Sequence, residues 1–514
     1  MTDRPHLAVI GAGPAGVAAA LAAVTHGVRV TLVDAAPEAG GQFYRSPAVA
    51  LGARRPQALH HRWRTWQRLR AALDSHLAAG HITHLKDHHV WCVEGDTGGR
   101  GRLDGPDGRY GTGAEQQPRP NGQQGGPDAE FTGAFTVHAL LGPRQEQGVA
   151  VRADAVLLAT GGYEKVLPFP GWTLPGVLSA GGAQAMLKGG LVLPGRTVVV
   201  AGTGPLLLPV ATGLAAAGAR VAALVESADP RALARSPGAL AARPGTLAEG
   251  AGYAARLLRH RVPVLVRHTV IEAHGADRLD GVTVAALTPD GRVRPGSERR
   301  IDCDALAVGH GMLPHTDLAE TLGCGLDGVA VRVDDEQRTD VPGVWAAGEA
   351  TGIGGAPLAL AEGHIAGRCA AARLTGGTPD PRTWAAASRR RAALRTFSAA
   401  LGPVYAPPAG WAERITDDTV VCRCEEVTAG TVRAAVADLG AGDLRTVKLL
   451  TRAGMGWCQG RMCGPAVAGL SGCAETAMRR PFARPVPLGV LAGQTGDDTS
   501  RPELDCRQAD NGTP

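Results

Sequence analysis

The sequence predicts an α/β fold with two doubly wound units and a small helical domain near the C-terminal end. Two segments, 7–33 and 197–226, each pass from a short apolar strand through a glycine-rich turn and a helix into a second strand. That order is the opening of a doubly wound parallel sheet. A cysteine-rich segment follows at 416–475, and 514 residues suffice for two or three domains.

Composition narrows the functional classes. The formal charge of +5 comes from mixed signs, and aromatic residues make up only 4% of the chain, which disfavours nucleic-acid binding. No apolar run reaches the roughly 20 residues that cross a bilayer, so no membrane span is expected. A strand that begins near Leu7 leaves no room for an export signal. The ten cysteines therefore indicate metal or redox ligands in a cytoplasmic protein.

The first glycine loop, GAGPAG, directly follows a strand and opens a helix. Gly11 permits the tight turn, Gly13 lets the backbone approach a pyrophosphate, and Gly16 allows close packing of helix on strand, with Ala15 in the same loop. The helix N-terminus offers free N–H groups to phosphates. Asp34 ends the next strand, 23 positions after Gly11, where a carboxylate would hold ribose hydroxyls. The segment predicts a dinucleotide site rather than a bland turn.

Two further segments favour FAD at this first site. Gly41 and Gln42 lie just past the acidic residue, where small residues would admit the rest of a long dinucleotide. Thr160 and Gly161 belong to an ATG sequence that resembles the crossover of two-dinucleotide flavoproteins. Both segments are therefore expected beside the cofactor.

A third segment, at 339–349, resembles the second FAD motif of the same flavoproteins. It ends in Gly348 and Glu349, where the commoner acidic residue is Asp. A carboxylate still serves to bind the ribityl chain, although it is one methylene longer. A helix expected to start near Pro357 would direct its positive end at the flavin and favour the reduced anion.

The second glycine loop follows the strand at 198–201. Gly202 and Gly204 keep the pattern, but Leu207 replaces the third glycine, and Glu226 ends the next strand. The acidic residue suits an unphosphorylated adenosine ribose. The loop favours NAD(H), or another adenine nucleotide such as ATP. The alternative is that this unit is a degenerate Rossmann half that binds no nucleotide and only supports the fold.

Four cysteines form a C-x-C and a C-x₄-C pair with 33 residues between the pairs: Cys422, Cys424, Cys458 and Cys463. Four thiolates on two loops can hold the two irons of a [2Fe-2S] cluster. A structural zinc site is the alternative, but zinc modules favour C-x₂–₄-C pairs and C-x-C departs from that spacing. The other six cysteines lack ligand spacing and are expected to be core or surface thiols: Cys92, Cys303, Cys324, Cys369, Cys473 and Cys506.

The predicted fold class is therefore a two-dinucleotide-binding, Rossmann-like flavoprotein fold with a small C-terminal helical [2Fe-2S] domain. The FAD unit is expected to be discontinuous, because a second nucleotide unit interrupts it. The expected boundaries are an FAD-binding part at 1–190 with a disordered insertion at 95–130, a second nucleotide unit at 191–300, the returning FAD unit at 301–375, a connector at 376–415, the cluster domain at 416–475 and a tail at 476–514.

The motifs together resemble the FAD/NAD-binding α subunits of heteromeric amino-acid and opine dehydrogenases. That family includes the A subunit of opine oxidase, the B subunit of hydrogen cyanide synthase and the α subunits of proline and hydroxyproline dehydrogenases. The likeness covers most of the chain, through GAGPAG, GGQFYR, ATGGYEKVLPFPG, AGTGPLLLPVA, AAGEATGIGG, CRCEEVT and MGWCQGRMCGP. The last two sequences resemble the bacterioferritin-associated-ferredoxin-like (BFD-like) [2Fe-2S] domain.

The resemblance implies a division of labour within a complex. A flavoprotein β subunit, similar to D-amino-acid oxidases, would oxidise the substrate, and this chain would carry the electrons through its cluster and FAD. A small ferredoxin-like subunit is a further candidate partner. His310, His315 and His364 stand alone in loops or helices, so no catalytic acid–base residue is nominated.

Three hypotheses follow from the sequence. The leading one is an electron-transfer α subunit of an amino-acid, opine or (hydroxy)proline dehydrogenase. The first rival is a self-sufficient NAD(P)H-dependent flavin and iron–sulfur reductase. The second rival is a non-enzymatic scaffold whose second nucleotide site holds structural ATP.

Overall fold

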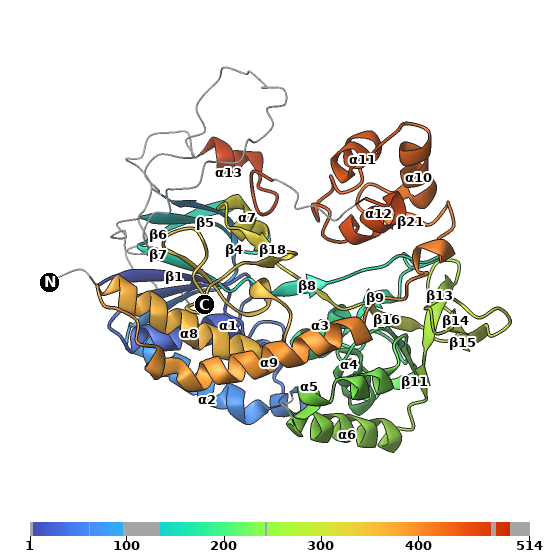
Figure 1. Ribbon diagram of the computed structural model, residues 1–514, viewed down its shortest axis with the longest axis horizontal. Helices are drawn as coiled ribbons and strands as arrows, with labels where there is room; N and C mark the ends of the chain where they lie inside the picture. Colours follow the sequence, from blue (N-terminus) through green and yellow to red (C-terminus); the bar gives the residue numbers. More distant parts are fainter. Residues whose placement is uncertain (1–3, 61, 96–133, 242–243, 474–479, 494–514) are drawn as a thin grey trace.

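The computed structural model describes residues 4–60, 62–95, 134–241, 244–473 and 480–493 (Figure 1). Its first parallel sheet has the strand order β20-β7-β1-β2-β3. Strands β1, β7 and β20 are short and wholly buried, as expected for a sheet covered on both faces, whereas β3 at one edge is only partly buried. Their bounds are β1 (His6–Ile10), β2 (Arg29–Val33), β3 (Ile82–Leu85), β7 (Ala155–Leu158) and β20 (Val344–Ala346).

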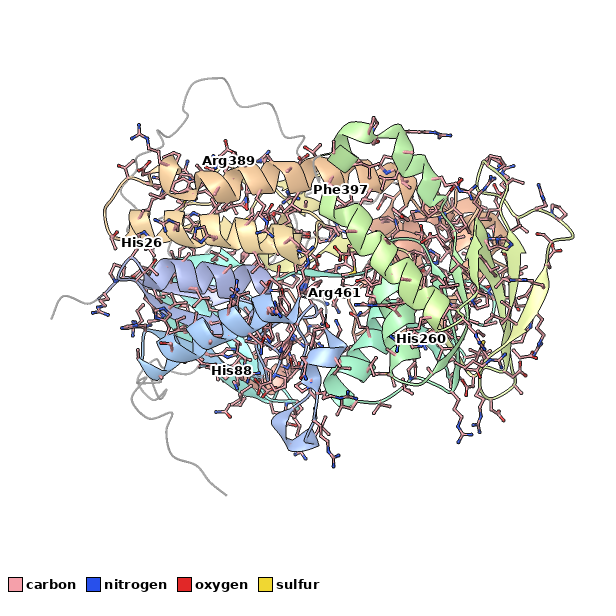
Figure 2. All side chains as sticks on the ribbon, turned by 90° about the horizontal axis from the view of Figure 1, so that it is seen from below. His26, His88, His260, Arg389, Phe397 and Arg461 are labelled. Carbon is pink, nitrogen blue, oxygen red and sulfur yellow. The ribbon has the colours of Figure 1, made fainter. Side chains whose placement is uncertain are left out.

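A layer of helices covers one face of this sheet. The helices α2 (Trp63–Ala78), α1 (Pro14–Val24), α8 (Ala356–Leu374) and α9 (Ala385–Val404) lie side by side (Figure 2). A side chain at Gly363 would overlap the Ala15 carbonyl, and one at Gly367 would overlap that of Ala19. The small residues therefore let the backbones of α8 and α1 touch, which fixes the returning part of the chain on the first helix.

The second parallel sheet has the order β12-β11-β10-β16-β9. All of its strands lie between β7 and β20 in the sequence, so this unit interrupts the first sheet. The chain crosses between the sheets as an antiparallel ribbon of β8 (Gly162–Glu164) and β17 (Met312–Pro314). The strands and helices of this unit are β9 (Val177–Ser179), α3 (Ala180–Gly190), β10 (Thr197–Gly202), α4 (Leu207–Ala216), β11 (Arg220–Glu226), α5 (Pro237–Ala241), α6 (Pro244–Arg259), β12 (Val264–Val266) and β16 (Ala305–Gly309).

Each parallel sheet carries an antiparallel one of three strands. The first comprises β4 (His88–Gly95), β5 (Phe135–Leu141) and β6 (Gln147–Ala153), and the second β13 (His268–His274), β14 (Gly281–Ala286) and β15 (Arg299–Asp302). A short hairpin, β18 (Leu326–Asp327) with β19 (Ala330–Val331), follows α7 (Asp317–Thr321). Apart from Gly95 at the end of β4, the predicted insertion at 95–130 lies outside the described residues.

A small helical domain follows α9 in the sequence. It comprises β21 (Val420–Cys422), β22 (Val427–Thr428), α10 (Ala429–Ala437), α11 (Leu444–Thr451) and α12 (Gly464–Ser471), which share a core of their own. Figure 1 shows it above the second sheet, beyond the end of α9. None of the helices among the described residues combines the length and apolarity that crossing a bilayer requires.

Residues 480–493, which belong to the predicted tail, pack against the antiparallel sheet that adjoins the first parallel sheet. The Ala483 N–H donates to the Trp91 carbonyl at 2.9 Å, and Phe482 meets the Trp91 ring edge-on. The short helix α13 (Leu488–Ala492) buries Val490 against Trp91 and Leu140. Residues 494–514 lie outside the described part of the chain.

Candidate functional site: two nucleotide edges and a cysteine loop

The predicted FAD residues meet at the carboxyl edge of the first sheet, where ligands of such folds bind. The glycine loop follows β1, Asp34 follows β2, Thr160 follows β7 and Gly348 follows β20. A side chain at Gly16 would overlap the carbonyl oxygen of Gly11, so only glycine lets α1 pack this closely on the loop. The N-terminus of α1 has no side-chain cap, which leaves its backbone N–H groups available.

Asp34 lies directly beside the first glycine loop. One carboxylate oxygen accepts from the Ala12 N–H and the other from the Ala36 N–H at 2.7 Å. Burial raises the pKa of Asp34, while these two hydrogen bonds lower it. Gly41 contacts the loop as well, because a Cβ on it would lie 2.8 Å from the Gly13 Cα. Its neighbour Gln42 is exposed.

The crossover and the second FAD motif lie side by side. The Ala347 N–H donates to the Leu158 carbonyl at 3.0 Å. This bond aligns β20 with β7 just before the crossover at Thr160 and Gly161. A Cβ at Gly162, next to Gly161, would lie 3.4 Å from a carboxylate oxygen of Glu349. Burial raises the pKa of Glu349, whereas a hydrogen bond from the Gly355 N–H lowers it.

A buried carboxylate that the sequence analysis missed holds the second FAD motif in place. Glu362, on α8, accepts from the Gly348 N–H at 3.0 Å and from the Thr351 hydroxyl at 2.9 Å. Its other oxygen accepts from Arg395 Nε on α9 at 2.9 Å. A charged residue in an otherwise small and apolar helix face was the signal available in the sequence.

The second glycine loop is built in the same way. Glu226 accepts from the Gly204 N–H at 3.2 Å and from the Ala228 N–H at 2.9 Å. Burial raises the pKa of Glu226 to about 7. The Thr203 hydroxyl, beside Gly202, donates to the carbonyl of Tyr405 at 3.5 Å. The connector therefore reaches this nucleotide edge, which no local pattern predicted.

The four predicted cluster cysteines come together as two pairs. Cys463 hydrogen-bonds with Cys422, which lowers the pKa of the Cys422 thiol, and Cys424 hydrogen-bonds with Cys458. The pairs also influence each other electrostatically, so all four thiols share one neighbourhood. Within the described ranges, no three or more His, Cys, Asp or Glu side chains are arranged around a single metal ion. Two pairs match the ligand set of two irons.

The cysteine pairs differ in exposure. Cys422 and Cys463 are buried in the core of the small domain, Cys458 is half-buried and Cys424 is exposed. One side of the thiol set therefore faces the domain interior and the other faces outward.

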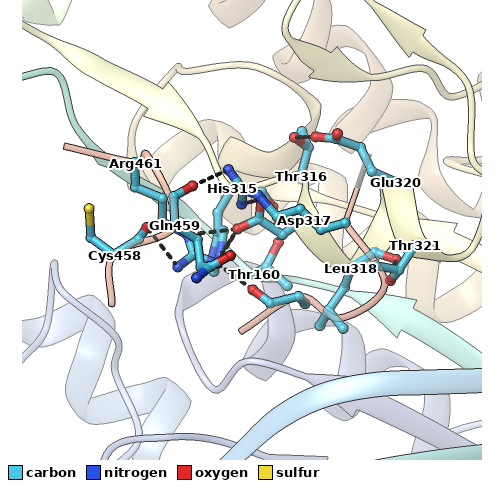
Figure 3. Close-up of polar contacts among 12 residues, drawn as sticks. Thr160, His315, Thr316, Asp317, Leu318, Glu320, Thr321, Cys458, Gln459 and Arg461 are labelled. Carbon is cyan, nitrogen blue, oxygen red and sulfur yellow. Dashed lines mark hydrogen bonds and ion pairs between the residues drawn. The ribbon is translucent and has the colours of Figure 1, made fainter. Parts of the chain in front are cut away.

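We call the segment from Cys458 to Cys463 the cysteine loop, and the unit built on the first parallel sheet the flavin unit. Asp317, the first residue of α7, connects the two (Figure 3). One carboxylate oxygen accepts from Arg461 Nε at 2.7 Å and from the His315 ring at 3.1 Å. The other accepts from Arg480, which also donates to the Gln459 carbonyl. Burial would raise the pKa of Asp317, but His315 and the two guanidinium groups lower it to about 2.

The same contacts continue to the FAD edge. The Thr160 hydroxyl donates to the His315 carbonyl at 2.6 Å, and the His315 N–H donates to the Gly161 carbonyl at 3.0 Å. On the other side, Arg461 donates to the Cys458 carbonyl at 3.4 Å. A continuous set of hydrogen bonds thus joins the crossover to the cysteine loop.

The other basic residues near the cysteines have separate partners. Arg423 stacks over the Trp172 ring of the second unit at 5.0 Å, and Arg452 pairs with Glu425 at 2.8 Å. Met462 packs against the core of the second unit. The segments that carry the four cysteines therefore contact both parallel-sheet units.

Comparisons with known proteins agree with this arrangement. The family described as pyridine nucleotide-disulphide oxidoreductase matches residues 5–363, and the BFD-like [2Fe-2S] binding domain matches residues 420–470. The HcnB subunit of hydrogen cyanide synthase from Pseudomonas protegens is 33% identical over 88% of this chain and 89% of its own length. The A subunit of opine oxidase from Agrobacterium tumefaciens is 30% identical over 96% of this chain and 92% of its own length.

One solved structure is similar over nearly the whole chain. The L-proline dehydrogenase of P. horikoshii superposes with a TM-score of 0.61 at 18% identity, covering 96% of this chain and 81% of that one. At that identity the likeness concerns the fold alone. Together with the two family matches, it confirms the predicted fold class.

Proposed function

This chain belongs to the pyridine nucleotide-disulphide oxidoreductase family and carries a BFD-like [2Fe-2S] domain, and from that premise we propose that it is the electron-transfer subunit of a heteromeric amino-acid or opine dehydrogenase. The family resemblance predicted from the motifs is confirmed, and with it FAD and a [2Fe-2S] cluster as the implied cofactors. The observation that carries the proposal is the direct joining of the cysteine loop to the FAD edge through Asp317.

The residues at the first edge fit FAD by their chemistry. Gly11, Gly13 and Gly16 admit a pyrophosphate to the N-terminus of α1, with Ala15 in the same turn. Asp34 would hold ribose hydroxyls and Glu349 the ribityl chain. Thr160, Gly161, Gly41 and Gln42 border the same edge. The bound flavin would exchange electron pairs, and the cluster held by the four cysteines would pass electrons singly.

The residues of this chain bind and orient these groups. The four thiolates would supply the ligands of the cluster, and Cys422 and Cys463 are buried in the domain, shielded from water. The uncapped N-terminus of α8, which begins at Ala356, favours negative charge at the flavin edge. The role left for this chain is to accept electrons and pass them on.

The partner is proposed from the relatives. Both relatives described above are, by name, subunits of larger enzymes. We therefore expect a flavoprotein β subunit that oxidises an amino acid, an opine or a (hydroxy)proline. A small ferredoxin-like subunit is a further candidate.

The alternative is a self-sufficient NAD(P)H-dependent reductase. The observation that favours it is the second nucleotide edge, where Gly202 and Gly204 precede a buried Glu226 bound to the loop backbone. NAD(H) or ATP would suit that edge. In this case the chain would take hydride from a nicotinamide without a partner.

The proposal is tested by purifying the tagged chain from cells that produce it naturally. We expect a flavoprotein subunit in stoichiometric amount, and reduction of a dye by the complex with an amino acid, an opine or proline. The isolated chain should show no such activity. A chain that purifies alone and reduces the dye with NADH would contradict the proposal.

A further inference from the structure

The position of Asp317 suggests more than a local ion pair. We infer that Asp317 is the positioning residue that holds the C-x₄-C loop of the cluster domain against the flavin unit and so sets the spacing across which electrons pass. The inference rests on the proposed function for its electron-transfer part. Its structural part stands on the contacts alone.

Both carboxylate oxygens of Asp317 are used, and each reaches the cysteine loop. One accepts from Arg461, which lies between the two cysteines of the pair, and the other from Arg480, which donates onward to the Gln459 carbonyl. The side chains of Asp317, Arg461 and Arg480 are only 12%, 19% and 13% exposed. Charge pairs shielded from water depend strongly on geometry.

On the flavin side, Asp317 cannot move freely. The residues after it on α7, Leu318 and Ala319, are buried in the core that also contains Ile10 and Leu158 of the first sheet. The residue two positions before it, His315, is hydrogen-bonded to the crossover through both its backbone N–H and its carbonyl. Asp317 is therefore a rigid extension of the FAD edge.

The returning segment braces the same junction. Arg461 also donates to the Ala483 carbonyl, and Ala483 is itself buried in the core of the flavin unit. Three segments far apart in sequence thus converge on one carboxylate: α7, the cysteine loop and residues 480–483.

Charge explains why a carboxylate is needed here. Arg461 and Arg480 bring two positive charges to one place, and Asp317 is the only acidic side chain that forms ion pairs with them in the described part of the chain. An amide at 317 would leave two guanidinium groups, both largely shielded from water, without a negative charge between them, so they would repel each other. We therefore expect the cysteine loop to move away from the flavin unit. Because the rate of electron transfer falls steeply with distance, transfer between flavin and cluster should become slower.

The test uses the purified chain with its FAD and iron in place. Hydrogen exchange is followed in peptides covering 456–464. In a separate experiment, a light flash in the presence of EDTA as electron donor reduces the bound flavin, and absorbance spectroscopy follows how fast the cluster then responds. Asp317→Asn should accelerate exchange in this loop at least about tenfold and slow the response of the cluster by a similar factor. FAD and iron contents should stay at the wild-type level.

Controls separate positioning from general destabilisation. Asp417→Asn removes an exposed carboxylate paired with Arg433 inside the cluster domain and should change neither rate. Asp317→Glu restores the charge and should recover part of both effects. Arg461→Lys, which keeps the charge but loses the paired donors, serves if Asp317→Asn does not fold, and it should accelerate loop exchange too.

The outcomes are distinguishable. Loop exchange and cluster response that are both unchanged in Asp317→Asn and Arg461→Lys would overturn the inference. A wild-type chain that shows a protected loop, released by Asp317→Asn, but no electron exchange between flavin and cluster would leave the structural part intact and contradict the proposed function instead.

Discussion

The carboxylate of Glu362, which has no solvent exposure, is paired with the guanidinium of Arg395 at 2.6 Å. The pair joins α8 to α9 directly behind the second FAD motif, and the same carboxylate holds the Gly348 N–H and the Thr351 hydroxyl. Burial raises the pKa of Glu362 and the charge of Arg395 lowers it. The ion pair therefore connects the connector helix to the FAD edge.

Removing one member of this pair should destabilise the chain and release FAD. Arg395→Ala leaves a buried, unpaired carboxylate and is expected to cost about 3 kcal/mol of folding free energy. Denaturant unfolding and the FAD-to-protein ratio check this. Arg391→Ala, on the same helix but paired with the exposed Asp335, should be milder. Equal losses of folding free energy and of bound FAD in the two variants would show that the Glu362 contact has no special role.

Gly16→Ala should prevent FAD binding, because the new methyl group would overlap the Gly11 carbonyl and displace α1 from the loop. The matched variant is Gly213→Ala in α4, where the nearest atom to the new methyl lies 3.9 Å away. There alanine should be tolerated and should stabilise the helix by up to about 1 kcal/mol. The flavin absorbance of the purified variants measures both. Full flavin content in Gly16→Ala would refute the assigned loop geometry.

Cys458→Ser and Cys463→Ser should each remove iron and acid-labile sulfide while leaving FAD bound, since each takes a thiolate from a different cysteine pair. Cys473→Ser, in the same domain but outside the two pairs, should keep its iron. Metal analysis together with the visible spectrum decides the matter. Wild-type iron and sulfide in either ligand variant would mean that the ligand set is misassigned.

Glu226 should make stability fall as pH rises. Its pKa of about 7 lies above the ordinary value of 4.5, so the folded state holds a proton that the unfolded state has lost between those values. The stabilisation is complete below about 4.5 and is lost as pH rises through about 7, on the order of a few kcal/mol. The stability of Glu226→Gln relative to the wild type should therefore increase between pH 5 and pH 8, as measured by thermal unfolding. The control is Glu413→Gln, at an exposed glutamate, and a pH-independent difference for Glu226→Gln would contradict this prediction.

Local sequence patterns predict the residues whose spacing a single motif determines. Gly11, Asp34 and Gly204 were identified because strand, turn and helix fix their spacing within about thirty residues, and the cysteine pairs because a ligand set leaves a spacing of its own. Glu362 and Asp317 have no such pattern. Their partners lie 33 and 144 residues away in sequence, and only tertiary packing brings them together. The same holds for Tyr405 at the second glycine loop and for residues 480–493 on the flavin unit.

The proposed function requires that this chain receive its electrons from a partner protein and not from a nicotinamide. The most direct test mixes the isolated chain, holding FAD and iron, with excess NADH and then NADPH in the absence of oxygen. We predict that the flavin absorbance persists with either nucleotide, whereas dithionite bleaches flavin and cluster together. Rapid bleaching of the flavin by NADH or NADPH, followed by reduction of the cluster, would contradict the claim.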